Sequence, residues 1–182
     1  MNRLQEKYTS QIRPELGKEL AINNSLAVPR LEKIVINAGV GRAVMDSKHI
    51  DPVVEVITAI AGQKPVVTRS KKSIATFKLR DNMPIGVMVT LRGERMYTFL
   101  DLLNSVVLPR LRDFRGLSNM SFDKSGNYNI GIADHTVFPQ AASIEVGQPV
   151  GVQITLVTKT PNVEAAKALL LGLGVPLAKE AK

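Results

Sequence analysis

The order of strand-like and helix-like segments is the feature that most constrains the fold of this chain. Runs rich in β-branched residues, some alternating with polar or small residues, lie at 31–37, 65–68, 85–91, 128–132 and 150–157. Such runs are typical of strands with one face on a core. Helical segments separate some of these runs but not all, so there is no strict βαβ rhythm. We therefore expect an α+β fold, with helices packed on one face of a mostly antiparallel sheet and a long basic loop between two strands.

The first twenty residues have the spacing of an amphipathic helix. Leu4, Tyr8, Ile12 and Leu16 recur every four positions, which places them on one helical face. Pro14 lacks a backbone N–H and clashes with the preceding turn, so we expect a kink or a break there.

Three further helices are expected. One follows possible N-cap oxygens at Asp46–Ser47 and ends at Gly62, and another follows Gly93 and ends near Pro109. The last is capped by Thr160, with the next proline in the favoured first position. The apolar residues expected to face inward from these helices are Ile50, Val53, Val54, Ile57, Ile60, Met96, Phe99, Leu100, Leu103, Val107, Ala165, Leu169 and Leu170.

Length and composition predict one globular domain over residues 1–182, with an N-terminal helix at about 2–20 and an α+β body at about 28–175. There is no internal repeat or Gly/Ser linker to divide the chain. No apolar run approaches the roughly 18 residues that cross a bilayer, and the first residues lack the apolar core of a signal peptide. The absence of cysteine excludes disulfides, a thiolate nucleophile and Cys-ligated zinc, and it is compatible with a cytosolic location.

No set of residues predicts catalysis. His49 and His135 are isolated and lack metal-ligand spacing, so we expect each to have a surface or helix-packing role. Gly39-Val40-Gly41 follows a strand, but Val44 stands where a dinucleotide fingerprint needs its third glycine. Gly62-Gln63-Lys64-Pro65 likewise lacks the spacing of a phosphate loop. We expect no enzyme activity, no catalytic residues, no metal and no cofactor.

The net charge of +8 favours a polyanionic partner, and its distribution is more informative than its sum. The segment from Lys64 to Arg80 contains six basic residues and no acid, with hydroxyl groups and Phe77 interleaved. Lysine and arginine neutralise phosphates, hydroxyls bind phosphate or ribose oxygens, and a phenyl ring can stack on an unpaired base. RNA binding is therefore favoured over the alternative of a solvated loop whose charges only maintain solubility.

A second basic cluster contains Arg110, Arg112 and Arg115, close to Pro109. Two interpretations remain open for it: a fork of guanidinium groups on phosphates, or an arginine paired with Asp113 that fixes the following loop. Aromatic residues form only 4% of the chain and there is no tryptophan. This composition favours recognition of folded RNA by shape and backbone over stacking on single strands. Because the basic residues do not lie on an amphipathic helix, membrane binding is not expected.

Seven segments in order carry a resemblance to a known family. They are residues 28–41, beginning Val28-Pro29-Arg30, Gly62-Gln63-Lys64-Pro65, residues 69–80, Met83-Pro84-Ile85-Gly86, residues 89–97, residues 108–116 and Gly126-Asn127-Tyr128-Asn129-Ile130-Gly131. In this order they resemble the bacterial form of ribosomal protein five of the large subunit. The resemblance covers most of the chain from Tyr8 to Thr160.

The resemblance implies an α+β protein of the cytoplasmic ribosome that binds 5S rRNA and large-subunit rRNA in the central protuberance, beside other 5S-binding ribosomal proteins. It implies that a basic loop at about 70–83 contacts transfer RNA in the peptidyl site, and that another surface bridges to small-subunit ribosomal protein thirteen. Residues 133–149 depart from the family pattern, with Asp134-His135 and Phe138-Pro139-Gln140.

The site residues expected on these grounds fall into three groups. Those for 5S rRNA are Asn37, Gly39, Gly41, Gln63, Lys64, Thr68, Arg69 and Arg92. Those for the transfer-RNA loop are Ser70, Lys71, Lys72, Ser73, Thr76, Phe77, Lys78 and Arg80. Those for the bridge or for rRNA are Arg110, Arg112 and Arg115. The competing hypothesis is a non-ribosomal basic RNA-binding scaffold or translation regulator, which would bind several RNAs with similar affinity.

Overall fold

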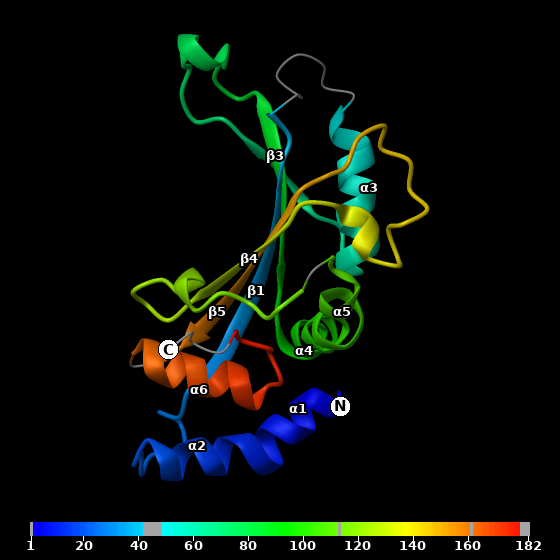
Figure 1. Ribbon diagram of the computed structural model, residues 1–182. Coiled ribbons are helices and arrows are strands. Elements are labelled where there is room, and N and C mark those ends of the chain that lie inside the picture. Colours follow the sequence, from blue (N-terminus) through cyan, green and yellow to red (C-terminus); the bar gives the residue numbers. More distant parts are fainter. Residues whose placement is uncertain (1, 42–48, 113, 161, 179–182) are drawn as a thin grey trace. The chain divides into compact units, whose positions relative to one another are not determined.

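The computed structural model describes residues 2–41, 49–112, 114–160 and 162–178, and confirms the α+β fold (Figure 1). In these residues the strands form one five-stranded antiparallel sheet of order β2-β3-β1-β5-β4. The strands are β1 (Arg30–Gly39), β2 (Val66–Arg69), β3 (Pro84–Leu91), β4 (Tyr128–Ile132) and β5 (Val152–Lys159).

The chain forms two compact units. Unit 1 contains the described residues of Met1–Ile34, Leu91–Ile130 and Thr155–Lys182, and unit 2 those of Val35–Thr90 and Gly131–Ile154. β1, β3, β4 and β5 each contribute residues to both units. The expectation of a single domain over residues 1–182 stays a prediction.

The N-terminal amphipathic helix of unit 1 is confirmed. It consists of three consecutive segments, α1 (Arg3–Lys7), the π-helical η1 (Tyr8–Ile12) and α2 (Arg13–Glu19). All four predicted inward-facing side chains are buried: Leu4, Tyr8, Ile12 and Leu16. Pro14 does not break the helix, because it lies in the first turn of α2, directly after the wider π-helical turn.

The other helices of unit 1 match the predicted periodicity, but not every predicted end. They are α4 (Gly93–Leu102), the π-helical η5 (Leu103–Val107), α5 (Leu108–Arg110) and α6 (Val163–Gly172). The inward-facing residues predicted for them are buried, and Leu111, one residue beyond Arg110, is extended. The Thr160 cap is wrong: Asn162 caps α6, and its side-chain oxygen accepts a hydrogen bond from Ala165 N at 2.9 Å. The proline expected at the first helical position lies outside the described residues.

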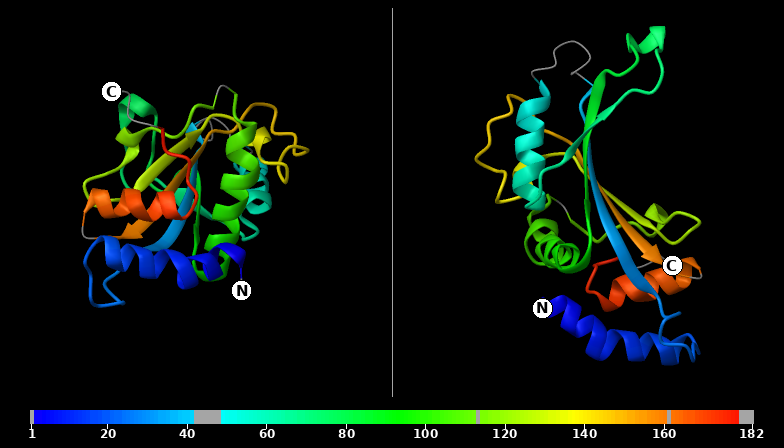
Figure 2. Two further views of the ribbon diagram at one scale, coloured as in Figure 1. Left: turned by 60° about the horizontal axis from the view of Figure 1, so that its bottom comes forward. Right: turned by 180° about the vertical axis from the view of Figure 1, so that it is seen from behind.

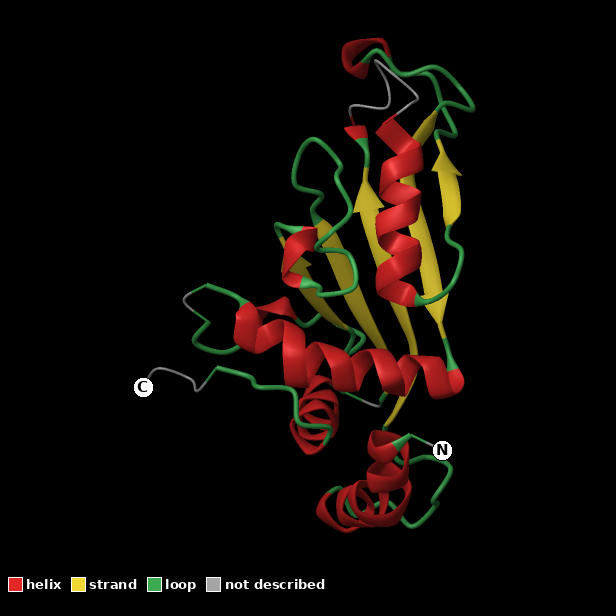
Figure 3. Cartoon of the chain, turned by 90° about the vertical axis from the view of Figure 1, so that its right-hand side faces the viewer, coloured by secondary structure: helices red, strands yellow, loops and turns green. Residues whose placement is uncertain are grey.

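In unit 2, α3 (Ile50–Ala61) lies along one face of the strands (Figure 3). Its expected cap at Asp46–Ser47 lies outside the described residues. Gly62 ends the helix with φ +62°, as predicted, and its N–H donates to Thr58 O at 2.9 Å. Val54 is only partly buried, and Val56 is buried in its place, because positions 53, 56, 57 and 60 form the face toward the strands.

Residues 114–127 are irregular but held by local contacts, including the 3-10 turn η6 (Asn119–Ser121). The Tyr128 hydroxyl donates to Ser118 O at 2.7 Å, and its ring meets that of Phe122 edge-on at 4.6 Å between centroids. Burial raises the pKa of Tyr128, against a smaller opposing effect of a hydrogen bond with Ser121.

Candidate nucleic-acid interface

In unit 2, α3 covers one face of the strands. No helix among the described residues of that unit covers the other face, which is called the open face (Figures 1 and 3). In β3, Val87, Val89 and Leu91 are buried, whereas the alternate residue Met88 is exposed. Val66 of β2 pairs with Met88 across the ladder, and their side chains are 66% and 37% exposed. Within the described residues of unit 2, no helix covers these two side chains, so they form an apolar part of an open platform.

Polar groups and exposed glycine backbone continue this platform on β1 and just beyond its end. Asn37 lies between the fully buried Ile36 and Ala38, so its half-buried side chain belongs to the open face. Gly39 and Gly41 are exposed, and a Cβ atom added at either would have no atom within 4 Å. A nucleic-acid strand can therefore approach the backbone closely here.

Four other residues predicted to bind 5S rRNA lie in or just before β2. Thr68 belongs to the open face, and Arg69 partly stabilises the base of the basic loop. Thr68 pairs with Gly86 and is half-buried, which places its hydroxyl at the same face as Val66 and Met88. Gln63 is half-buried and Lys64 exposed, both just before β2. Arg69 donates from Nη1 to Asn82 O at 3.0 Å, so part of its guanidinium group supports the base of the loop.

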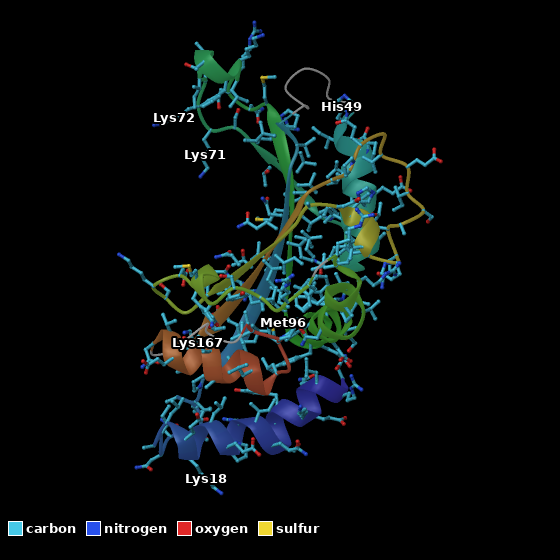
Figure 4. All side chains as sticks on the ribbon, in the orientation of Figure 1. Lys18, His49, Lys71, Lys72, Met96 and Lys167 are labelled. Atoms are coloured by element: carbon cyan, nitrogen blue, oxygen red, sulfur yellow. The ribbon has the colours of Figure 1, made fainter. Side chains whose placement is uncertain are left out.

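The basic segment between β2 and β3 is a folded hairpin that extends beyond the ends of both strands (Figure 2). Ile74 and Leu79 exchange backbone hydrogen bonds of 3.0 and 3.1 Å. The 3-10 turn η4 (Ala75–Phe77) connects these two residues at the tip of the hairpin. All side chains from residue 71 to 78 are exposed, Phe77 by 66%. Figure 4 shows Lys71 and Lys72 pointing away from the hairpin, as side chains that bind phosphate would.

Four predicted arginines belong to unit 1. Arg92 is exposed and lies 3.9 Å from Glu32, with both side chains about half exposed, so its charge is only weakly offset. Arg110, Arg112 and Arg115 are all exposed. Asp113, the alternative partner for this cluster, lies outside the described residues.

The two histidines have different surroundings, and each fits one of the two roles expected, surface or packing. His49 is exposed, as expected for a surface residue. His135 is not on the surface: it is 3% exposed in the 3-10 turn η7 (His135–Val137), and its Nδ1 accepts a hydrogen bond from Val150 N at 3.1 Å. A hydrogen bond from the Thr136 backbone lowers the pKa of the neighbouring Asp134. Its burial and its hydrogen bond with Val150 give His135 a packing role within residues 133–149, the segment that departs from the family pattern.

Two other kinds of site, a metal-binding cluster and a membrane-spanning helix, are absent from the part of the chain that the structure describes. No group of three or more His, Cys, Asp or Glu residues there could hold a metal ion. No helix among those residues is long and apolar enough to cross a membrane.

Comparison with known proteins decides the family. A model described as ribosomal protein L5 matches residues 24–80, and a second model, for the C-terminus of the same ribosomal family, matches residues 84–177. The chain belongs to the ribosomal protein L5 family. It is 55% identical over 179 residues to large ribosomal subunit protein uL5 of Acidobacterium capsulatum, with 98% of each chain covered. It is 53% identical over 174 residues to the uL5 protein of Chloroflexus aggregans, covering 96% of this chain and 97% of that one. Against the uL5 protein of Macrococcus caseolyticus the identity is 50% over 179 residues, covering 98% of this chain and 100% of that one.

The structure adds residues of this L5 chain that the sequence-based prediction missed. Val66, Met88 and the half-buried Thr90 lie at alternate positions on the open face. The signal for Met88 and Thr90 was the period-two pattern of β3, in which Val87, Val89 and Leu91 form the opposite, core face. The pattern alone did not show which face helices would cover.

Proposed function

We propose that this chain binds 5S rRNA through the open face of unit 2 and helps to attach it to the large ribosomal subunit in the central protuberance. As a member of the L5 family, the chain is a structural protein of the large ribosomal subunit in the cytoplasm, in contact with ribosomal RNA. The single observation that carries the 5S proposal is the uncovered platform of Asn37, Thr68 and the bare backbone at Gly39.

The chemistry of this platform suits folded RNA. Amide and hydroxyl side chains can donate to and accept from ribose, phosphate and base edges, and an exposed glycine backbone permits close approach. Val66 and Met88 provide apolar contact area between the polar groups. Lys64 and Arg69 add positive charge beside the platform, and Arg92 in unit 1 adds another exposed cation.

The basic hairpin between β2 and β3 has a separate proposed role, contact with transfer RNA in the peptidyl site. Its exposed lysines, hydroxyls and Phe77 are groups that bind a phosphate backbone and an accessible base. The bridge to small-subunit ribosomal protein thirteen is proposed from the family resemblance, with residues 133–149 or Arg110, Arg112 and Arg115 as its surface. Other 5S-binding ribosomal proteins are the remaining proposed partners.

The first test is a filter-binding titration against 5S rRNA and a transfer RNA, at about 50 mM and about 200 mM salt. Phosphate contacts weaken as salt rises, whereas hydrogen bonds to a defined RNA shape preserve a preference. We expect binding to both RNAs at low salt and a preference for 5S rRNA that persists at higher salt. Equal binding to both RNAs at both salt concentrations would contradict a 5S-specific platform and favour a general RNA-binding scaffold.

The platform is tested by removing single polar groups. Asn37→Ala and Thr68→Val should each lower the affinity for 5S rRNA by on the order of 1 kcal/mol, because each removes hydrogen-bonding groups from the open face. Circular dichroism and the midpoint of urea unfolding serve as folding controls. Unchanged 5S affinity in a folded variant would remove that residue from the interface.

A further inference from the structure

Ser70 differs from every other residue of the predicted transfer-RNA loop. It lies directly after β2, and it is 8% exposed, whereas residues 71–78 are all exposed. A side chain so enclosed cannot present its hydroxyl to an RNA backbone without opening the loop. The structure therefore separates Ser70 from the lysines that follow it.

Ser70 joins the two arms of the hairpin at its base through four hydrogen bonds. Its backbone N–H donates to Met83 O at 2.8 Å, and its carbonyl oxygen accepts from Asn82 N at 3.0 Å. Its hydroxyl donates to Arg80 O and accepts from Met83 N at 3.2 Å. Both the donor and an acceptor site of the hydroxyl are therefore used within the loop.

The rest of the hairpin depends on this base. Ser73 Oγ accepts from Asp81 N at 2.9 Å, and the Ile74–Leu79 bridge closes the tip. Two residues without the freedom of glycine adopt positive φ, Lys78 at +53° and Asn82 at +63°. Such conformations persist only where surrounding contacts fix them, and Asn82 lies beside the Ser70 contacts.

The ladder beneath the hairpin is also irregular. Thr68 pairs with Gly86 but Arg69 pairs with Pro84, so Ile85 is an extra residue opposite β2. A bulge of this kind bends its strand and changes the direction of the adjoining segment. Ile85 has no partner in β2, but its carbonyl oxygen accepts a 2.9 Å hydrogen bond from Val40 N, next to the end of β1. This hydrogen bond holds the bulge on the sheet.

We propose that Ser70 is a positioning residue, a clamp that holds the basic hairpin folded and correctly directed before RNA binds. This inference rests on the proposed role of the hairpin in contacting transfer RNA. A loop already ordered in the free protein loses less conformational entropy on binding, so the same lysines bind more tightly. The clamp raises affinity without touching RNA.

The clamp itself is tested without RNA, by amide hydrogen exchange of the full chain. In Ser70→Ala, the amides of Leu79 and Asn82 should exchange at least about tenfold faster, because the hydroxyl bonds at the base are lost. Val40 N–H, which holds the bulge, should exchange as in the unmodified chain. Thr76→Val removes an exposed hydroxyl from the same hairpin and should not change these exchange rates. Ser70→Thr keeps the hydroxyl and should restore protection.

Binding to transfer RNA separates positioning from direct contact. Ser70→Ala should weaken binding about threefold to tenfold, since extra loop entropy is lost on binding. The slope of log K against log salt should be unchanged, because every lysine and arginine is retained. A lower slope would mean that lysines or arginines lose phosphate contacts in Ser70→Ala, so that loop entropy is not the cause, and unchanged affinity would mean that Ser70 does not position the hairpin for RNA; either would overturn the inference.

The two proposals fail in different measurements. Unchanged exchange in Ser70→Ala would refute the clamp, whatever the RNA results. Failure of the unmodified chain to bind transfer RNA would refute the proposed function of the hairpin, although faster exchange in Ser70→Ala would still show that its hydroxyl orders the loop. Faster exchange, weaker binding, an unchanged salt slope and rescue by Ser70→Thr together would support the positioning role.

Discussion

At the scale of single residues, two strand glycines of unit 2 differ in the space around them. A Cβ atom at Gly86 would lie 2.8 Å from Thr68 Oγ1 and 3.2 Å from Ala38 O, whereas one at Gly131 would have no atom within 4 Å. We expect Gly86→Ala to lower the free energy of unfolding by about 1–2 kcal/mol, because it overpacks the contacts of β3 with both neighbouring strands. Gly131→Ala is the matched control and should be neutral or slightly stabilising. Urea denaturation of both variants would test this, and equal stabilities would contradict it.

A second residue-scale prediction concerns alkaline pH. Burial raises the pKa of Tyr97 to about 12; the ring of Tyr8, 6.3 Å away, adds to the increase and Arg30 opposes it. Tyr97 ionises near 10 when unfolded, so its contribution to stability is complete below pH 10 and is lost between about 10 and 12. Between pH 9 and pH 11 the unmodified chain should lose about 1 kcal/mol more stability than Tyr97→Phe. Parallel losses in urea denaturation of the two proteins would show that Tyr97 is not responsible.

Asn37 and Thr68 were expected at the RNA interface from the family resemblance and from their hydrogen-bonding groups, and their role in binding RNA stays a prediction. Asn37 and Thr68 lie on the open face because each lies in a strand whose opposite face is covered. Ser70 was grouped with the exposed lysines beside it, because its partners, residues 80–83, are ten or more positions away. Hydrogen bonds of that kind depend on how the loop closes, which no local pattern specifies.

At the scale of elements, the basic hairpin and the platform should be separable. Lys71→Glu with Lys72→Glu should weaken transfer-RNA binding at least about tenfold and lower the salt slope by about one unit per lost phosphate contact. Binding of 5S rRNA should change less, because the platform of Asn37 and Thr68 is intact. The matched control is Lys7→Glu with Lys18→Glu, an equal charge change at two exposed lysines of the N-terminal helix. Equal losses for both RNAs would contradict the division between hairpin and platform.

Element positions were predictable where one side-chain pattern dominates. The strands at 31–37 and 85–91 were found within three residues of their ends, because alternating burial requires alternating side chains. The Thr160 cap was wrong because Thr160 and Asn162 are both good caps, and the position of α6 decides between them. The bulge at Ile85 had no sequence signal, since an extra residue in a ladder is defined only against its partner strand.

At the scale of the whole molecule, the ordered set of motifs predicted the family, and the family models then confirmed it. The charge surplus of +8 gave only the chemical class of the partner. The two compact units were not predicted, because each combines segments far apart in the sequence. Whether they unfold together is a property of the long strands that contribute to both.

The last prediction is that the two units unfold in one transition, as a single domain would. β1, β3, β4 and β5 each have residues in both units, so the backbone of each of these strands runs from one unit directly into the other. All three tyrosines of the chain, Tyr8, Tyr97 and Tyr128, belong to unit 1, and there is no tryptophan. Tyrosine fluorescence therefore reports unit 1, while methyl NMR signals of the buried Ile36 and Val87 report unit 2.

In a urea titration both signals should have the same midpoint. The stronger test uses Gly86→Ala, whose overpacked contacts all lie in unit 2. If the units are coupled, this variant lowers the midpoint of the tyrosine signal as much as that of the methyl signals, although it touches no tyrosine. A tyrosine midpoint that stays in place while the methyl midpoint falls would mean that unit 1 is stable without unit 2, and that the open platform can unfold and refold while the N-terminal helix and α6 remain packed.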